Sequence, residues 1–138
     1  MGTLPPFWPD FVDHGPEDPF WEGQANHDTA DLASMPPVDM VTGWWDCFLP
    51  DQLDDFERLR AAGVTTRLLV GRGAHSDFGT GRQATISALE WMRHHLLGEP
   101  IADAPSVRIY VQQADVWLDL PDWPPPTEEQ SLYLAAGR

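Results

Sequence analysis

The chain has 138 residues, of which 42% are apolar, enough for one ordinary domain with a buried core. Its formal net charge of −14 would repel the phosphates of nucleic acids and anionic lipid head groups, so neither is an expected partner. The first six residues show no signal-peptide pattern, and no apolar run approaches the roughly 18 residues of a membrane-spanning helix. We therefore expect a protein that is soluble and most simply cytoplasmic.

Metal and cofactor chemistry find little support in the composition. Cys47 is the only cysteine, which excludes an internal disulfide and a cysteine-rich metal cluster. Because Phe48 follows it, we expect a small buried side chain rather than a reactive thiol. His75 and Asp77 could contact a metal, but no third ligand at helical spacing accompanies them. No metal and no cofactor is expected.

Residues 1–37 are interrupted by seven prolines, which predicts loops and short helices. The segment also carries five bulky aromatic residues that need to be covered: Phe7, Trp8, Phe11, Phe20 and Trp21.

The middle of the chain has the pattern of an α/β protein. Strands are predicted at residues 38–42 and 66–70, each followed by a glycine, and a helix is predicted at residues 51–62 between them. A second helix should run from a capping box at Thr80 and Gln83 to residue 97. We expect it to bury its apolar residues, which are Ile86, Leu89, Met92 and Leu96. This order suits parallel strands joined by helices.

One residue does not fit this pattern. Asp39 is unusual inside a strand that should be buried on both faces.

After Pro100, strands are predicted at residues 107–111 and 132–134, with a proline-rich turn region at residues 117–126. Two strands with no helix between them indicate an all-β unit.

Asp46 and His75 follow the two predicted parallel strands. Asp46 lies three residues after the first strand's glycine, and His75 lies four residues after the second's. Loops at the carboxyl ends of neighbouring parallel strands gather at one edge of a sheet. A carboxylate there can accept a hydrogen bond from one imidazole nitrogen and leave the other as a general base. The spacing alone also allows an ordinary loop aspartate and a partly exposed histidine.

The sequence VTGWWD at residues 41–46, then RLLVG at residues 67–71 and His75, resembles the cocaine-esterase and X-prolyl dipeptidyl-peptidase family. Residues 14–21 resemble the end of that family's helical cap, and residues 107–111, 114–117, 122–126 and 132–134 resemble the entry into its jelly-roll domain. The resemblance implies the end of the cap at 1–37, the C-terminal part of an α/β-hydrolase sheet at 38–100, and the first strands of an incomplete jelly-roll domain at 101–138.

The resemblance also implies roles for single residues. Asp46 would be the acid and His75 the base of a Ser-Asp-His triad, while Trp44 and Trp45 would line or support the acyl pocket, with packing as the alternative for at least one of them. The full-length relative would cleave a small acyl ester or an X-Pro peptide through an acyl-enzyme. Residues 72–74 (RGA) replace a proline and a tryptophan usual in the family, so the aim of His75 depends on how this loop packs.

A nucleophile is not recognisable. No Gly-x-Ser-x-Gly motif occurs, and Ser76 is adjacent to His75 and cannot reach that imidazole in triad geometry. We therefore expect a partial serine hydrolase that lacks the serine and is inactive alone. Two alternatives stay open, which are a non-catalytic module that pairs through an open sheet edge and one chain of a split hydrolase whose complementary chain carries the serine.

Overall fold

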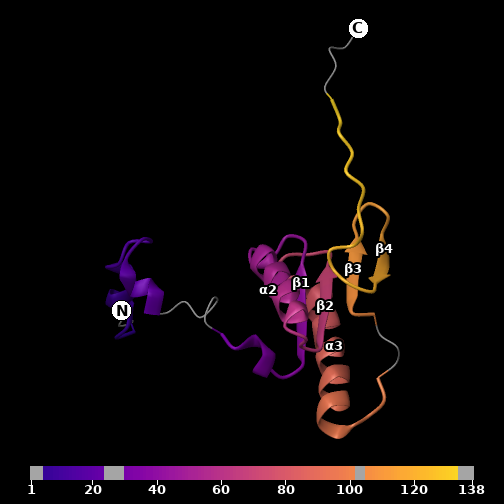
Figure 1. Cartoon of the computed structure of the whole chain (residues 1–138), viewed down its shortest axis with the longest axis horizontal. Coiled ribbons are helices and arrows are strands. Elements are labelled where there is room, and N and C mark those ends of the chain that lie inside the picture. Colours follow the sequence, from indigo (N-terminus) through magenta and orange to yellow (C-terminus); the bar gives the residue numbers. More distant parts are fainter. Residues whose placement is uncertain (1–4, 24–29, 102–104, 134–138) are drawn as a thin grey trace. The chain divides into compact units, whose positions relative to one another are not determined.

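The computed structural model describes residues 5–23, 30–101 and 105–133, and the chain divides into two compact units, Met1–Asp31 and Leu32–Arg138 (Figure 1). In the first unit, the helix α1 (Trp8–Val12) and the 3-10 helix η1 (Pro19–Gly23) confirm the expected short helices between prolines.

Several of the bulky aromatic residues of the first unit pack against one another. Phe11 makes edge-to-face contacts with Phe7, Phe20 and Trp21, with ring centroids 5.4 to 6.1 Å apart. His14 stacks on Phe20 at 4.1 Å. This cluster supplies part of the cover that the sequence required, although Phe7 and Phe11 remain about half exposed.

The second unit is built on one sheet with the strand order β1-β2-β3-β4. β1 (Val38–Gly43) and β2 (Thr66–Gly71) pair in parallel over their whole length, with Gly43 opposite Gly71. β3 (Val107–Val111) pairs in parallel with β2, and β4 (Val116–Leu120) is antiparallel to β3. The two parallel strands predicted from the sequence are thus confirmed.

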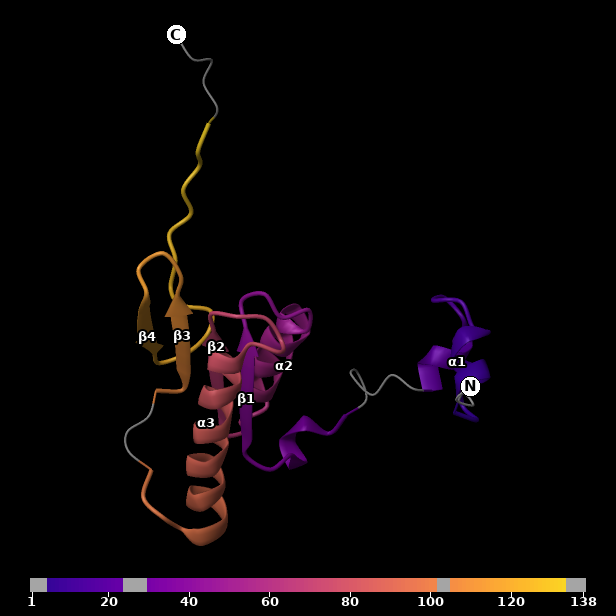
Figure 2. The same cartoon turned by 180° about the vertical axis from the view of Figure 1, so that it is seen from behind.

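Two helices cover opposite faces of this sheet (Figures 1 and 2). The helix α2 (Leu49–Ala61) buries Phe56 in the same cluster as Leu68 of β2. The helix α3 (Phe78–Leu97) contacts Arg67, the residue of β2 next to Leu68, through Ser87. Because successive side chains of a strand point to opposite faces, the two helices lie on opposite sides. Both predicted helices are confirmed.

The start of α3 differs from the prediction. The cap is Asp77, whose carboxylate accepts the Thr80 N–H at 2.8 Å, and not Thr80 paired with Gln83. An aspartate satisfies an unpaired helical N–H as well as a threonine does, so the helix begins earlier, at Phe78.

The buried face of α3 was also predicted wrongly. Ser87 and Trp91 are buried towards the sheet, whereas Ile86, Leu89, Met92 and Leu96 are 38%, 60%, 55% and 73% exposed. On the face of the sheet that α3 covers, the helix meets the charged residue Arg67 as well as apolar side chains. The spacing of apolar residues along α3 therefore does not identify the side of the helix that faces the sheet.

The predicted jelly-roll domain is not confirmed, since β3 and β4 extend the same sheet as β1 and β2. The turn prediction at residues 117–126 is wrong for residues 117–120, which belong to β4. Leu132 and Tyr133 are not in a strand, and Leu134 lies outside the described residues.

Cys47 is exposed, against the expectation of burial, because it lies in the turn between β1 and α2. Of the helices in the described ranges, none combines the length and apolar character needed to cross a membrane.

Candidate active site

The backbone holds together the two loops that leave β1 and β2. The Trp44 N–H donates to the carbonyl oxygen of Gly71 at 3.0 Å, and the Trp45 N–H donates to that of Gly73 at 3.1 Å. These two bonds hold the two loops together at the ends of the strands. Residues 72–74 are therefore bound, through Gly73, to the turn that carries Asp46.

Glycines allow this close approach. A Cβ atom on Gly43 would overlap the carbonyl oxygen of Gly73, and one on Gly73 would overlap the side chain of Asp77. A larger residue at position 43 would push the two loops apart, and one at position 73 would displace Asp77, the cap of α3. The loop that carries His75 keeps this path because both positions lack a Cβ.

Asp46 and His75 are brought together as the sequence predicted. Oδ2 of Asp46 lies 3.1 Å from Nδ1 of His75. The other carboxylate oxygen, Oδ1, accepts the Phe48 N–H at 3.0 Å. The Asp46 side chain is 4% exposed, whereas that of His75 is 65% exposed. The Asp46 carboxylate is therefore buried and held by the Phe48 N–H, and the His75 imidazole lies at the surface.

The electrostatics favour an ionised Asp46. The Phe48 N–H and, to a lesser degree, the His75 imidazole hold the pKa of the Asp46 carboxyl below its ordinary value of 3.8, against burial, which acts to raise it. A charged acceptor of this kind favours a proton on Nδ1 of His75 and leaves Nε2 unprotonated in the neutral ring. In the described part of the chain, Nε2 has no hydrogen-bond partner.

Phe48 is a site residue that the sequence reasoning missed. Its backbone orients Asp46, and its ring meets the His75 ring edge-to-face with centroids 5.3 Å apart. The available signal was local, because an aspartate commonly accepts the N–H of the residue two positions later.

Trp44 and Trp45 lie apart from the imidazole. They line an apolar groove of about 520 Å³ together with residues 109–113. His75 lines a different groove of about 570 Å³, shared with Arg82, Thr85 and Ile86 of α3. The Trp44 indole N–H donates to the carbonyl oxygen of Tyr110, so Trp44 also packs the sheet, while Trp45 is 71% exposed.

The acidic residues do not gather into a metal site. Among residues 5–23, 30–101 and 105–133, no three His, Cys, Asp or Glu side chains lie close enough together to hold an ion. Asp77 instead caps α3.

The family model of X-Pro dipeptidyl-peptidase (S15 family) matches residues 2–77, a segment that includes both Asp46 and His75. The chain belongs to this family. This S15 chain is also 30% identical to the cocaine esterase of Rhodococcus sp. (strain MB1 Bresler), over 99% of its own length and 26% of the esterase.

A solved structure supports the fold of this S15 family member. The crystal structure of an aminopeptidase from the marine sediment archaeon Thaumarchaeota archaeon matches with a TM-score of 0.62 and 24% identity, over 86% of this chain and 23% of that one. The similarity agrees with an α/β-hydrolase-like sheet. The chain thus spans about a quarter of the length of each of these two proteins.

Replacing Asp46 by asparagine is expected to reverse the tautomer of His75. Oδ1 must stay an acceptor for the Phe48 N–H, so the asparagine NH₂ group would face Nδ1 and require it to accept. The ring ¹⁵N shifts, measured above the pH range in which histidine titrates, should move from the Nδ1–H form to the Nε2–H form. A His95→Gln variant is the control, because it should leave the His75 ring signals as they are in the parent. An unchanged His75 tautomer in Asp46→Asn would contradict the contact between Asp46 and Nδ1 of His75.

Acid should remove the contribution of Asp46 to stability. Its folded-state pKa is depressed, so the stabilisation is complete above the unfolded value of 3.8 and is lost as pH falls through the folded value. The difference in unfolding temperature between the parent and Asp46→Asn should therefore be largest above about pH 5 and shrink steadily below about pH 4. A difference that stays constant over a thermal-melt series in this range would contradict the assignment.

Proposed function

We propose that this chain supplies the acid and the base of a Ser-Asp-His triad in an acyl hydrolase, with Asp46 as the acid and His75 as the base. The observation that carries the proposal is the 3.1 Å contact between a buried carboxylate and Nδ1 of an exposed imidazole. Membership in the S15 family supports the same chemistry.

Each residue has a definite task in this proposal. Nε2 of His75 accepts the proton of a serine hydroxyl as that oxygen attacks the substrate carbonyl, and then returns the proton to the leaving group. Asp46 holds the ring orientation and stabilises the imidazolium formed in between. The substrate class is an acyl ester or an X-Pro peptide, in line with the names of the esterase relative and of the family. The acyl-pocket role expected of Trp44 and Trp45 gains no support from the grooves, because these two residues line a different groove from His75.

The serine is proposed to come from polypeptide outside these 138 residues. The sequence has no Gly-x-Ser-x-Gly motif, and Ser87 is buried with its hydroxyl bound to Asp39 and Arg67. Within the same proposal, residues 1–37 correspond to the end of a cap, residues 38–100 to the hydrolase domain, and residues 101–138 to the entry into a jelly-roll domain.

A chimera tests the function. The purified chain alone should hydrolyse p-nitrophenyl acetate no faster than its His75→Ala variant. Grafted in place of the matching quarter of the Rhodococcus esterase, it should restore turnover. His75→Ala in the chimera should then lower kcat by about 10⁴-fold or more, since the triad acts as a unit. His94→Ala, at the far end of α3, is the matched control. A folded chimera whose activity survives His75→Ala would refute the proposal.

A second candidate function is a docking module, either non-catalytic or half of a split hydrolase. It is favoured by the apolar residues of α3 that stay exposed and by β1, which is an edge strand of the sheet. A complementary chain could pair with the open side of β1 and cover α3. Ile86 also lines the groove beside His75, so a polypeptide seated there would reach the imidazole.

Self-association tests the docking surface. If α3 is the surface, the chain at micromolar concentration should associate in sedimentation-velocity experiments, because an apolar face of this kind seeks cover. The double change Leu89→Lys and Leu96→Lys should yield a monomer. Leu132→Lys, at a position that is 94% exposed and outside α3, should leave association unchanged. A monodisperse parent that unfolds cooperatively would count against this surface as a docking site.

A further inference from the structure

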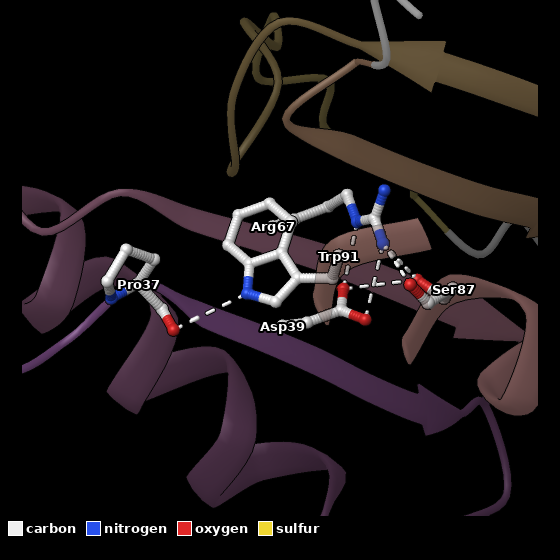
Figure 3. Close-up of polar contacts among 5 residues, drawn as sticks. All are labelled: Pro37, Asp39, Arg67, Ser87 and Trp91. Carbon is white, nitrogen blue, oxygen red and sulfur yellow. Dashed lines mark hydrogen bonds and ion pairs between the residues drawn. The ribbon is translucent and has the colours of Figure 1, made fainter. Parts of the chain in front are cut away.

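A buried polar cluster joins β1, β2 and α3 (Figure 3). Nε and Nη2 of Arg67 pair with the two carboxylate oxygens of Asp39 at 2.9 and 3.3 Å. Nη2 also donates to the carbonyl oxygen and the hydroxyl of Ser87, both at 2.7 Å, and that hydroxyl donates to Asp39 at 3.1 Å. The side chains of Arg67 and Asp39 are 10% and 8% exposed.

Trp91 completes the cluster. Its ring lies under the Arg67 guanidinium, 4.9 Å from the centroid, and its indole N–H donates to the carbonyl oxygen of Pro37 at 3.4 Å. Figure 3 shows Trp91 lying between Pro37 and the Arg67 guanidinium. The residue before β1, two strands and the helix that follows His75 are thus tied at one point.

Stability alone is a poor account of such a pair. A well-packed pair of apolar side chains of similar size often stabilises a protein as well as a buried ion pair does, because removing two charges from water is costly. What apolar side chains cannot supply is discrimination between alternative arrangements. The best-attested use of buried polar groups is to fix a register.

The position of the pair matches that use. Asp39 and Arg67 are directly opposite each other in the β1–β2 ladder. The next pairs along the ladder are Met40 with Leu68 and Val41 with Leu69, which are all apolar and would remain compatible after a slip of two residues. Such a slip would separate Asp39 from Arg67 and leave two charges buried without partners.

The register in turn decides whether the candidate active site exists. The strands lead to Gly43 and Gly71, only three and four residues before Asp46 and His75. A slip of two residues moves one strand by about 6.6 Å, at roughly 3.3 Å per residue. The Oδ2 to Nδ1 distance of 3.1 Å cannot survive that displacement.

We propose that Asp39 and Arg67 are positioning residues, whose buried pair selects the one β1–β2 register in which Asp46 meets His75. The inference rests on the proposed function of Asp46 and His75, because the register matters for catalysis only if they act together.

The test is a charge-free double variant, Asp39→Leu with Arg67→Met, in the full chain. It should still unfold cooperatively but show more than one set of His75 ring signals by NMR, with loss of the single Nδ1–H form. The matched control is Asp119→Leu with Arg108→Met. Arg108 and Asp119 are also directly opposite, in β3 and β4, and bonded at 3.1 Å, but they are about half exposed. This control should keep one set of His75 signals.

The outcomes separate the two proposals. A cooperative double variant with one parental set of His75 signals overturns the positioning role. If the double variant does not fold, Arg67→Lys and Arg67→Gln decide. Lys keeps a charge opposite Asp39 and should keep one set, Gln should give several, and equal behaviour overturns the role. An Asp46→Asn variant with the parental tautomer would instead refute the Asp46–His75 pair itself, whatever Asp39 and Arg67 do.

Discussion

The in-register parallel pairing of β1 with β2 is the constraint on which the rest of this structure depends. It sets Gly43 opposite Gly71, so that the two chains leave the sheet side by side. The backbone N–H groups of Trp44 and Trp45 then bond to the carbonyl oxygens of Gly71 and Gly73, which holds the two loops together. Parallel strands deliver their carboxyl ends to one edge, and for this reason residues 29 positions apart can share a hydrogen bond. The site is therefore organised by the backbone geometry of two strands in one register, the register that we propose the Asp39–Arg67 pair selects.

β1 and β2, together with the loops that follow them, carry two pairs of charged or ionisable side chains that differ in burial. Asp39 and Arg67 form a closed pair, in which both partners are buried and the arginine is further bound to Ser87. Asp46 and His75 form an open pair, with a buried carboxylate and an exposed ring. A closed pair has no accessible atom to offer a substrate, and its effect is confined to the arrangement of the strands. An open pair leaves one nitrogen available for proton transfer. Burial therefore assigns these two pairs to different work.

The sequence was a good guide to this site where backbone rules alone decide. Glycines at the strand ends and the positions of Asp46 and His75 follow from strand pattern and spacing. It was a poor guide to α3, because hydropathy cannot foresee that the helix turns Ser87 towards a buried arginine. For the same reason, the apolar period of Ile86 and Leu89 does not mark the side of α3 that faces the sheet. Phe48 was missed because its contact with His75 comes from a turn, which has no period to detect.

The misplaced face of α3 still has physical content. An apolar stripe on a helix is typical of a surface that packs against something, and the residues described here leave Leu89 and Leu96 largely exposed. The chain corresponds to 26% of its esterase relative, whose larger part offers candidates for that cover. Ile86 belongs both to this stripe and to the groove lined by His75. A polypeptide that covers α3 would therefore also reach the groove beside His75. In the proposed function this is where a serine hydroxyl meets Nε2, so the cover of α3 and the proposed nucleophile would come from the same side of the molecule.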